Sequence, residues 1–176
     1  MSISLETLSN LSEMPKQFER VFRLIPPSYL NWQPESWESI PGESFSALGQ
    51  ACHLRDIEID GYQVRIRRML AEEHPDLVSL DGYELAKQRR YSEAEPAEVI
   101  ATFRQAREVT LELIKTISES QLTRTATFGE YGQVTLKGLI HFLSSHDQQH
   151  LACMQWLLGK IESQAVSLRK GPEASQ

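Results

Sequence analysis

The sequence is poor in several features that mark specialised classes of protein. Among its 176 residues there are only two cysteines, Cys52 and Cys153, too few for the disulfide framework of a small secreted domain. Lysine and arginine total 18 against 24 aspartate and glutamate, and this net charge of −6 argues against a broad basic surface for nucleic acid. No stretch reaches the roughly 18 uncharged apolar residues of a membrane span, and the first residues lack the pattern of a secretory signal. We therefore expect a cytoplasmic protein with reduced thiols and with neither nucleic acid nor membrane as a partner.

What the chain does contain is a set of long helical patterns. Apolar residues recur at three- and four-residue spacing in four segments, whereas evidence for strands is weak throughout. The second segment can be capped by Ser44 or Ser46, and Pro96 suits the first turn of the third. The predicted helices cover about 11–25, 44–73, 96–117 and 135–160, with a further short helix within 81–90.

Four amphipathic helices of this length predict an all-α fold, an antiparallel four-helix bundle. The connections between the first and second helices and between the third and fourth are long. The first of them carries Trp32 and Trp37 among four prolines, and we expect an ordered loop whose aromatic side chains pack on the bundle. We expect one domain over 1–176, with a core of about 11–160 and a flexible tail at 161–176.

The last predicted helix carries two histidines on its apolar face. His146 and His150 stand four residues apart in "LIHFLSSHDQQHLACMQWLL" and project with the leucines, whereas His141 projects to the polar side. A buried imidazole without partners costs a few kcal/mol. Two side chains at this spacing can converge on one point, as the histidines of H-E-x-x-H do on zinc. The pair therefore favours a metal site.

A third histidine, His53, lies in the middle of the second predicted helix. A uniform helix places it on one face with a set of small, apolar and acidic residues, namely Gly49, Ile57, Asp60, Gly61 and Val64. His53, His146 and His150 would form a three-imidazole site with open coordination positions, which is typical of catalytic metals. Asp56 and Asp60 are candidates to orient an imidazole or to act as a general base, unless they lie on a solvated helix edge.

Other interpretations of these residues stay open. "HDQQH" is close to the zincin protease motif, although after His150 the chain offers only Glu162 and Glu173 as carboxylate ligands. The three histidines could also hydrogen-bond to neighbouring helices without any metal. Cys153, in line with His146 and His150, could be a fourth, thiolate ligand or a small buried hydrophobe.

These stretches resemble the DinB/YfiT-like superfamily of helical-bundle proteins. "FSALGQACHL" is similar to the family's W-S-x-x-E-x-x-x-H-L, with Phe45 at the tryptophan position and Gly49 at the glutamate position. "TLKGLIHFLSSHDQQHLACM" is similar to T-L-x-E-L-L-x-H-x-x-x-H-D-x-x-H-x-x-Q-I, with Cys153 where the family often has glutamine. The resemblance covers nearly the whole chain in helix order, and it implies metal binding by His53, His146 and His150.

The resemblance also implies a function. It suggests a divalent metal, zinc or nickel, acting on a small-molecule substrate in a protein that is often a homodimer. Because the family includes thiol-dependent transferases and a thiol-dependent isomerase, we expect S-transfer with a low-molecular-weight thiol as cosubstrate, or hydrolysis of small molecules. A non-catalytic metal-binding or stress-related bundle is the alternative.

Overall fold

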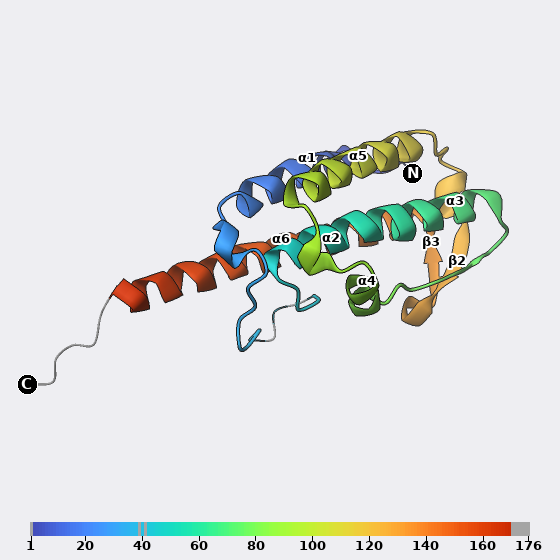
Figure 1. Ribbon diagram of the computed structural model, residues 1–176. Coiled ribbons are helices and arrows are strands. Elements are labelled where there is room, and N and C mark those ends of the chain that lie inside the picture. Colours follow the sequence, from blue (N-terminus) through green and yellow to red (C-terminus); the bar gives the residue numbers. More distant parts are fainter. Residues whose placement is uncertain (1, 39, 41, 170–176) are drawn as a thin grey trace, which may run out of the picture.

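The computed structural model describes residues 2–38, 40 and 42–169, and four long helical stretches dominate it. They are α1 (Leu5–Phe22), α2 (Ala47–Asp56) continued by α3 (Gln63–Ala71), α5 (Pro96–Lys115) and α6 (Leu136–Arg169). Helix α1 packs against α5 and α6, and α2 packs against the same two helices (Figure 1). The predicted all-α four-helix bundle is confirmed.

Local capping explains where the helices begin. Of the two candidate caps of α2, Ser46 is the one used, because its side chain accepts a hydrogen bond from the Gly49 N–H at 3.2 Å. Pro96 occupies the first turn of α5, as predicted. Helix α6 continues past the predicted end near residue 160 to Arg169, and its last turns extend beyond the other helices in Figure 1. Part of the tail predicted to be flexible is therefore helical, and its remainder, 170–176, lies outside the described residues.

The second bundle helix is not a uniform α-helix. Between α2 and α3 the segment Ile57–Tyr62 forms a π-helical turn, in which each N–H bonds five rather than four residues back. The wider turn changes the angle at which later side chains project. Val64, which a uniform helix places on the face of His53, is 43% exposed, whereas Ile66 is fully buried. The predicted shared face is wrong at Val64 for this reason, whereas Gly61 is buried as predicted.

A small sheet closes one end of the bundle and was not predicted. It contains β1 (Asp76–Leu77), β2 (Thr125–Phe128) and β3 (Gln133–Thr135) in that order. Strand β1 is parallel to β2, with Leu77 opposite Phe128, and β2 is antiparallel to β3, with Ala126 opposite Val134. These four side chains are buried. The sheet therefore joins the segment that follows α3 to the long connection that leads into α6 (Figure 1).

Two connecting segments bring side chains to the centre of the bundle. The predicted short helix is present as α4 (Gly82–Gln88). In the long connection before α2 an aromatic side chain packs on the bundle, as expected: Trp37 stacks on Trp156 of α6, with ring centroids 5.5 Å apart. No helix within the described part of the chain combines the length and apolar character needed to cross a membrane.

Candidate metal centre

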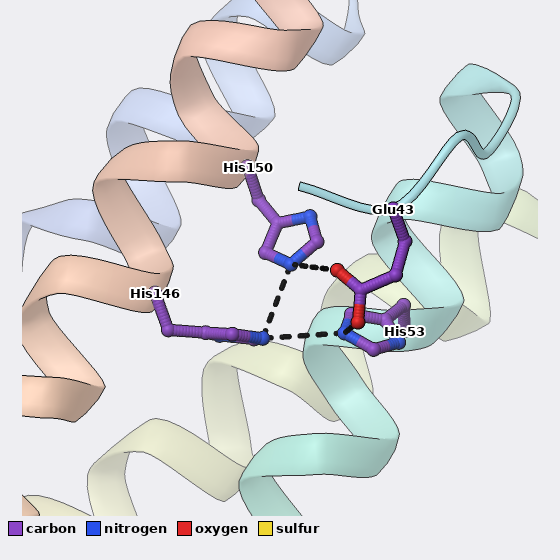
Figure 2. A group of neighbouring side chains, drawn as sticks. All are labelled: Glu43, His53, His146 and His150. Carbon is purple, nitrogen blue, oxygen red and sulfur yellow. Dashed lines mark hydrogen bonds and ion pairs between the residues drawn. The ribbon is translucent and has the colours of Figure 1, made fainter. Parts of the chain in front are cut away.

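The three histidines selected from the sequence meet in the middle of the bundle. His53 comes from α2, and His146 and His150 come from successive turns of α6 (Figure 2). The Nε2 atom of His146 lies 3.2 Å from Nε2 of His53 and 3.1 Å from Nε2 of His150. Two nitrogens bound to one ion at about 2.0–2.1 Å stand about 2.9–3.4 Å apart when the angle between them is near octahedral or tetrahedral. The observed spacing therefore fits a shared divalent ion.

A fourth donor, Glu43, completes the cluster. Its Oε1 lies 3.4 Å from Nε2 of His53 and its Oε2 lies 3.5 Å from Nε2 of His150, and the four donor atoms are all within 4.8 Å of one another. Glu43 lies in the loop before α2, where helical periodicity assigns no face, so the sequence argument missed it. The signal that could have found it is an acidic residue three positions before the cap Ser46 of the helix that carries His53.

Hydrogen bonding alone does not satisfy these imidazoles. A ring nitrogen carries either one proton or one lone pair. Nε2 of His146 can therefore form a full hydrogen bond with only one of its two histidine neighbours. The Nδ1 atom of His53 is buried, and nothing in the described part of the chain hydrogen-bonds to it. A cation among the converging lone pairs would satisfy the three Nε2 atoms together, which favours a metal over pairing to neighbouring helices alone.

Burial keeps all three imidazoles in the form that binds metals. Loss of solvent, together with the nearby His53, Arg107 and Arg65, lowers the pKa of His146 to about 3. Burial and the neighbouring histidines put the pKa of His150 well below its ordinary value. Burial also lowers the pKa of His53, against the opposing effect of Glu43. Neutral imidazoles with free lone pairs are the species that coordinate a metal at neutral pH.

The structure does not bring Asp56 and Asp60 to this cluster. Asp56 is buried, pairs with Arg55 at 2.6 Å and Arg89 at 3.0 Å, and accepts a hydrogen bond from the hydroxyl of Tyr91 at 2.8 Å. Asp60 pairs with the same Arg89 at 2.9 Å. Within the described residues, no hydrogen bond joins either carboxylate to a histidine. Because the arginines hold both carboxylates, the expected orienting or general-base role has no geometric support here.

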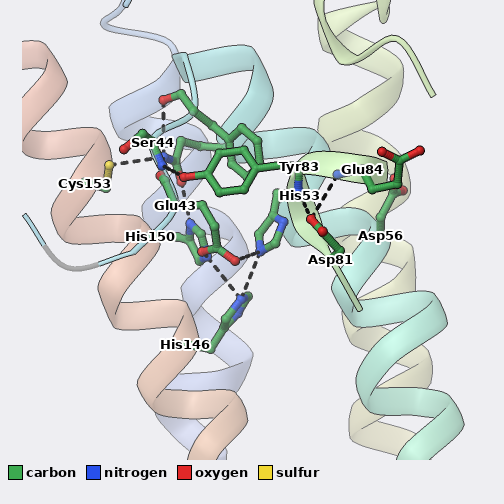
Figure 3. Close-up of polar contacts among 12 residues, drawn as sticks. Glu43, Ser44, His53, Asp56, Asp81, Tyr83, Glu84, His146, His150 and Cys153 are labelled. Carbon is green, nitrogen blue, oxygen red and sulfur yellow. Dashed lines mark hydrogen bonds and ion pairs between the residues drawn. The ribbon is translucent and has the colours of Figure 1, made fainter. Parts of the chain in front are cut away.

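Cys153 lies beside the cluster but outside the set of converging donors. Its thiol is 1% exposed, and Sγ is 3.1 Å from Nε2 of Gln50, which can donate to it (Figure 3). Burial raises the pKa of the thiol to about 11, with Glu43 adding to the shift, so the thiol is protonated at neutral pH. The geometry therefore agrees with the small buried hydrophobe among the two interpretations of Cys153.

Gly82, at the start of α4, lets that helix close over His53. A Cβ atom at this position would lie 2.8 Å from Cε1 and 2.9 Å from Nδ1 of the ring. We expect Gly82→Ala to lower the free energy of unfolding by about 1–3 kcal/mol through overpacking and to weaken metal binding by displacing the ring. Chemical denaturation and zinc titration measure the two effects. Gly159→Ala in α6 is the control, since a Cβ there meets no described atom within 4 Å; equal effects in both variants would contradict the prediction.

The fold and the cluster together define a helical-bundle protein with a candidate metal centre. The family model of the DinB superfamily matches residues 10–154, and the chain belongs to this superfamily. No curated protein matches the chain significantly. Among solved structures, YfiT from Bacillus subtilis, described as a probable metal-dependent hydrolase with an unusual four-helix bundle topology, is similar with a TM-score of 0.78. The two chains are 19% identical, and the match covers 92% of this chain and 91% of YfiT, which supports the shared fold.

Proposed function

We propose that the protein is a divalent-metal-dependent hydrolase of small molecules, with His53, His146, His150 and Glu43 as its metal donors. The observation that carries the proposal is the convergence of three Nε2 atoms and one carboxylate within 4.8 Å. The description of YfiT as a probable metal-dependent hydrolase supports the same reaction class. Three nitrogens and one oxygen form a donor set of intermediate softness, which suits zinc, nickel or another first-row divalent ion.

The four donors are suited to different tasks. When bound, a divalent ion supplies Lewis acidity toward a carbonyl and toward water. His53, His146 and His150 come from long helices that fix their positions, and being neutral they leave most of the charge of such an ion uncompensated. Glu43 comes from a loop, and its side chain is 32% exposed, so it can reach a water molecule entering the centre. If one oxygen of the carboxylate binds the ion, the other can accept a proton from the attacking water and deliver it to the leaving group, and we assign it this role.

The proposal is tested first by metal content and then by activity. We expect elemental analysis of the purified protein to find a first-row divalent metal and a chelator to lower the melting temperature. A panel of activated esters and amides should be hydrolysed by the metal-loaded protein, and His150→Ala should reduce turnover to the uncatalysed background. His141→Ala is the matched control, because His141 lies on the exposed face of the same helix. A protein that binds no metal, or a His150→Ala variant that keeps full activity, would rule the proposal out.

The same experiment separates the other reaction classes. If a metal-dependent product forms only when a low-molecular-weight thiol and an electrophile such as monobromobimane are both added, the enzyme is a thiol-dependent transferase. In that case Glu43 would accept the proton of the thiol. A well-metallated protein that catalyses neither reaction would instead be a non-catalytic metal-binding bundle.

A further inference from the structure

The side chain of Gln50 links two parts of the candidate metal centre, the loop that carries Glu43 and the helix that carries His150. The residue lies in the first turns of α2, and its side chain is fully buried, with 0% exposure. Its Nε2 atom donates to the backbone carbonyl of Glu43 at 2.9 Å and lies 3.3 Å from that of Phe45. Its Oε1 atom contacts Nδ1 of His150 on α6. One amide thus contacts both the loop that carries Glu43 and the helix that carries His150.

These contacts determine the orientation of the Gln50 amide, that is, the positions of its oxygen and nitrogen. Backbone carbonyl oxygens only accept hydrogen bonds, so the NH₂ group of Gln50 must face Glu43 and Phe45. The oxygen of the amide must then face His150, and it can only accept. Nδ1 of His150 therefore carries the proton, and Nε2 of the same ring carries a lone pair. That lone pair points at the cluster, 3.1 Å from Nε2 of His146.

The loop that carries Glu43 is held at two points. Gln50 binds the carbonyl of Glu43, and the next residue, Ser44, donates its backbone N–H to the hydroxyl of Tyr83 on α4 at 2.9 Å (Figure 3). Tyr83 is 54% exposed, whereas Gln50 is fully buried. An amide–carbonyl hydrogen bond that water cannot replace is costly to lose. Gln50 is therefore the inner anchor of the loop, and Tyr83 is the outer one.

We propose that Gln50 is the positioning residue of this centre: it holds His150 in the tautomer with a free Nε2 and docks the backbone of residues 43–45, so that the Glu43 carboxylate meets the three imidazoles. The inference rests on the proposed function for the nature of the bound ion. The tautomer and the docked loop, however, are properties of the metal-free chain and can be measured without an ion.

Two measurements test the two halves of this role. In metal-free protein labelled with ¹⁵N on histidine, we expect the His150 side chain to show the Nδ1–H tautomer in the wild type and a mixture of tautomers in Gln50→Leu. In competition with a chromogenic chelator, we expect the affinity of Gln50→Leu for zinc to be about 10- to 100-fold lower, the usual effect of removing the hydrogen-bond partner of a ligating histidine. Gln50→Glu keeps an acceptor for Nδ1–H of His150 but loses the donors to the loop. The His150 tautomer should therefore persist in this variant while the affinity for zinc falls.

Gln63 provides the matched control. It is a second buried glutamine on the same bundle helix, 6% exposed, and its Nε2 donates to the carbonyl of Ala106 at 2.9 Å, away from the cluster. Gln63→Leu should lower stability without changing either the His150 tautomer or the zinc affinity. A zinc affinity of Gln50→Leu within twofold of Gln63→Leu would overturn the proposal, and so would the Nε2–H tautomer of His150 in the wild type. If the wild type binds no divalent ion, the proposed function fails, while the tautomer measurement still decides the role of Gln50.

Discussion

Replacing Arg107 by methionine is expected to lower the free energy of unfolding by about 3–5 kcal/mol, a large part of the stability of a typical domain. Arg107 is a residue of α5 that is 1% exposed, and its guanidinium uses all five of its N–H donors. It contacts both carboxylate oxygens of Glu58 at 2.8 Å and those of Asp147 at 2.6 and 2.9 Å. The fifth bond goes to the carbonyl of Leu11 at 3.0 Å. Methionine would leave two buried carboxylates without a counter-charge.

The protonation of this cluster follows from its burial. Burial disfavours the charged guanidinium, but attraction to Asp147 and Glu58 outweighs that effect and raises the pKa of Arg107 above its ordinary value. Burial raises the pKa of Asp147 to about 6, although Arg107 opposes the rise. Glu58 belongs to the π-helical turn, and Asp147 directly follows the candidate ligand His146. The cluster therefore fixes α6 against the second bundle helix at the level of the candidate centre.

Two further variants separate lost charge balance from lost packing. Arg104→Met, on the exposed side of the same helix, removes an ion pair with Glu19 whose members are 3.5 Å apart, and it should change stability by less than about 1 kcal/mol. Adding Glu58→Gln and Asp147→Asn to Arg107→Met removes the unpaired charges, so urea denaturation should show partial recovery. If the triple variant is no more stable than Arg107→Met, uncompensated charge is not the cause.

Acidification is expected to destabilise the metal-free protein by about 2 kcal/mol between pH 7.5 and pH 6. Burial holds the pKa values of His53, His146 and His150 below the ordinary 6.5. The unfolded chain therefore takes up protons near pH 6.5 that the folded chain does not bind. Stability contributed by the neutral imidazoles is present above this pH and is lost as the pH falls, by at most about 0.8 kcal/mol at pH 6 for each imidazole that stays neutral.

The carboxyl group of Asp147 changes the stability with pH in the opposite direction. Because the pKa of Asp147 is raised to about 6, the folded protein binds this proton before the unfolded chain does, which offsets part of the loss below pH 6. Urea denaturation at a series of pH values, with chelator present, measures the net effect. His146→Leu should remove about a third of the dependence, whereas His141→Gln, on the exposed face, should leave it unchanged. A stability that stays constant across this range would show that the three imidazoles are not held neutral.

The sequence alone was sufficient to predict the helical bundle and the proximity of the three histidines. Helices as long as α5 and α6 repeat their apolar spacing over several turns, so their inward faces are well defined. His146 and His150 share such a face, and a search for a partner on another helix leads to His53. Their role as metal ligands stays a prediction, but their common position follows directly from periodicity.

Other parts of the molecule depend on features that periodicity does not encode. Strands of two to four residues, such as β1 and β2, are too short to show an alternating pattern. The π-helical turn carries Glu58, whose partner Arg107 lies 49 residues away in the sequence. The loop that carries Glu43 is contacted by Gln50 and Tyr83, from two different helices. Each of these features arises from tertiary contacts.

The spacing of the donors along the chain has a consequence for the whole molecule. His53 and His146 are separated by 93 residues, and α3, α4, α5 and the sheet all lie between them. An ion held by both would be a reversible cross-link that closes a loop of this length, comparable in its effect on chain entropy to a disulfide of the same span. The two cysteines of the protein are free, so the ion would supply a cross-link that no disulfide provides, and chelators or acid could open it. The supply of metal would then control the stability of the folded protein as well as its proposed activity.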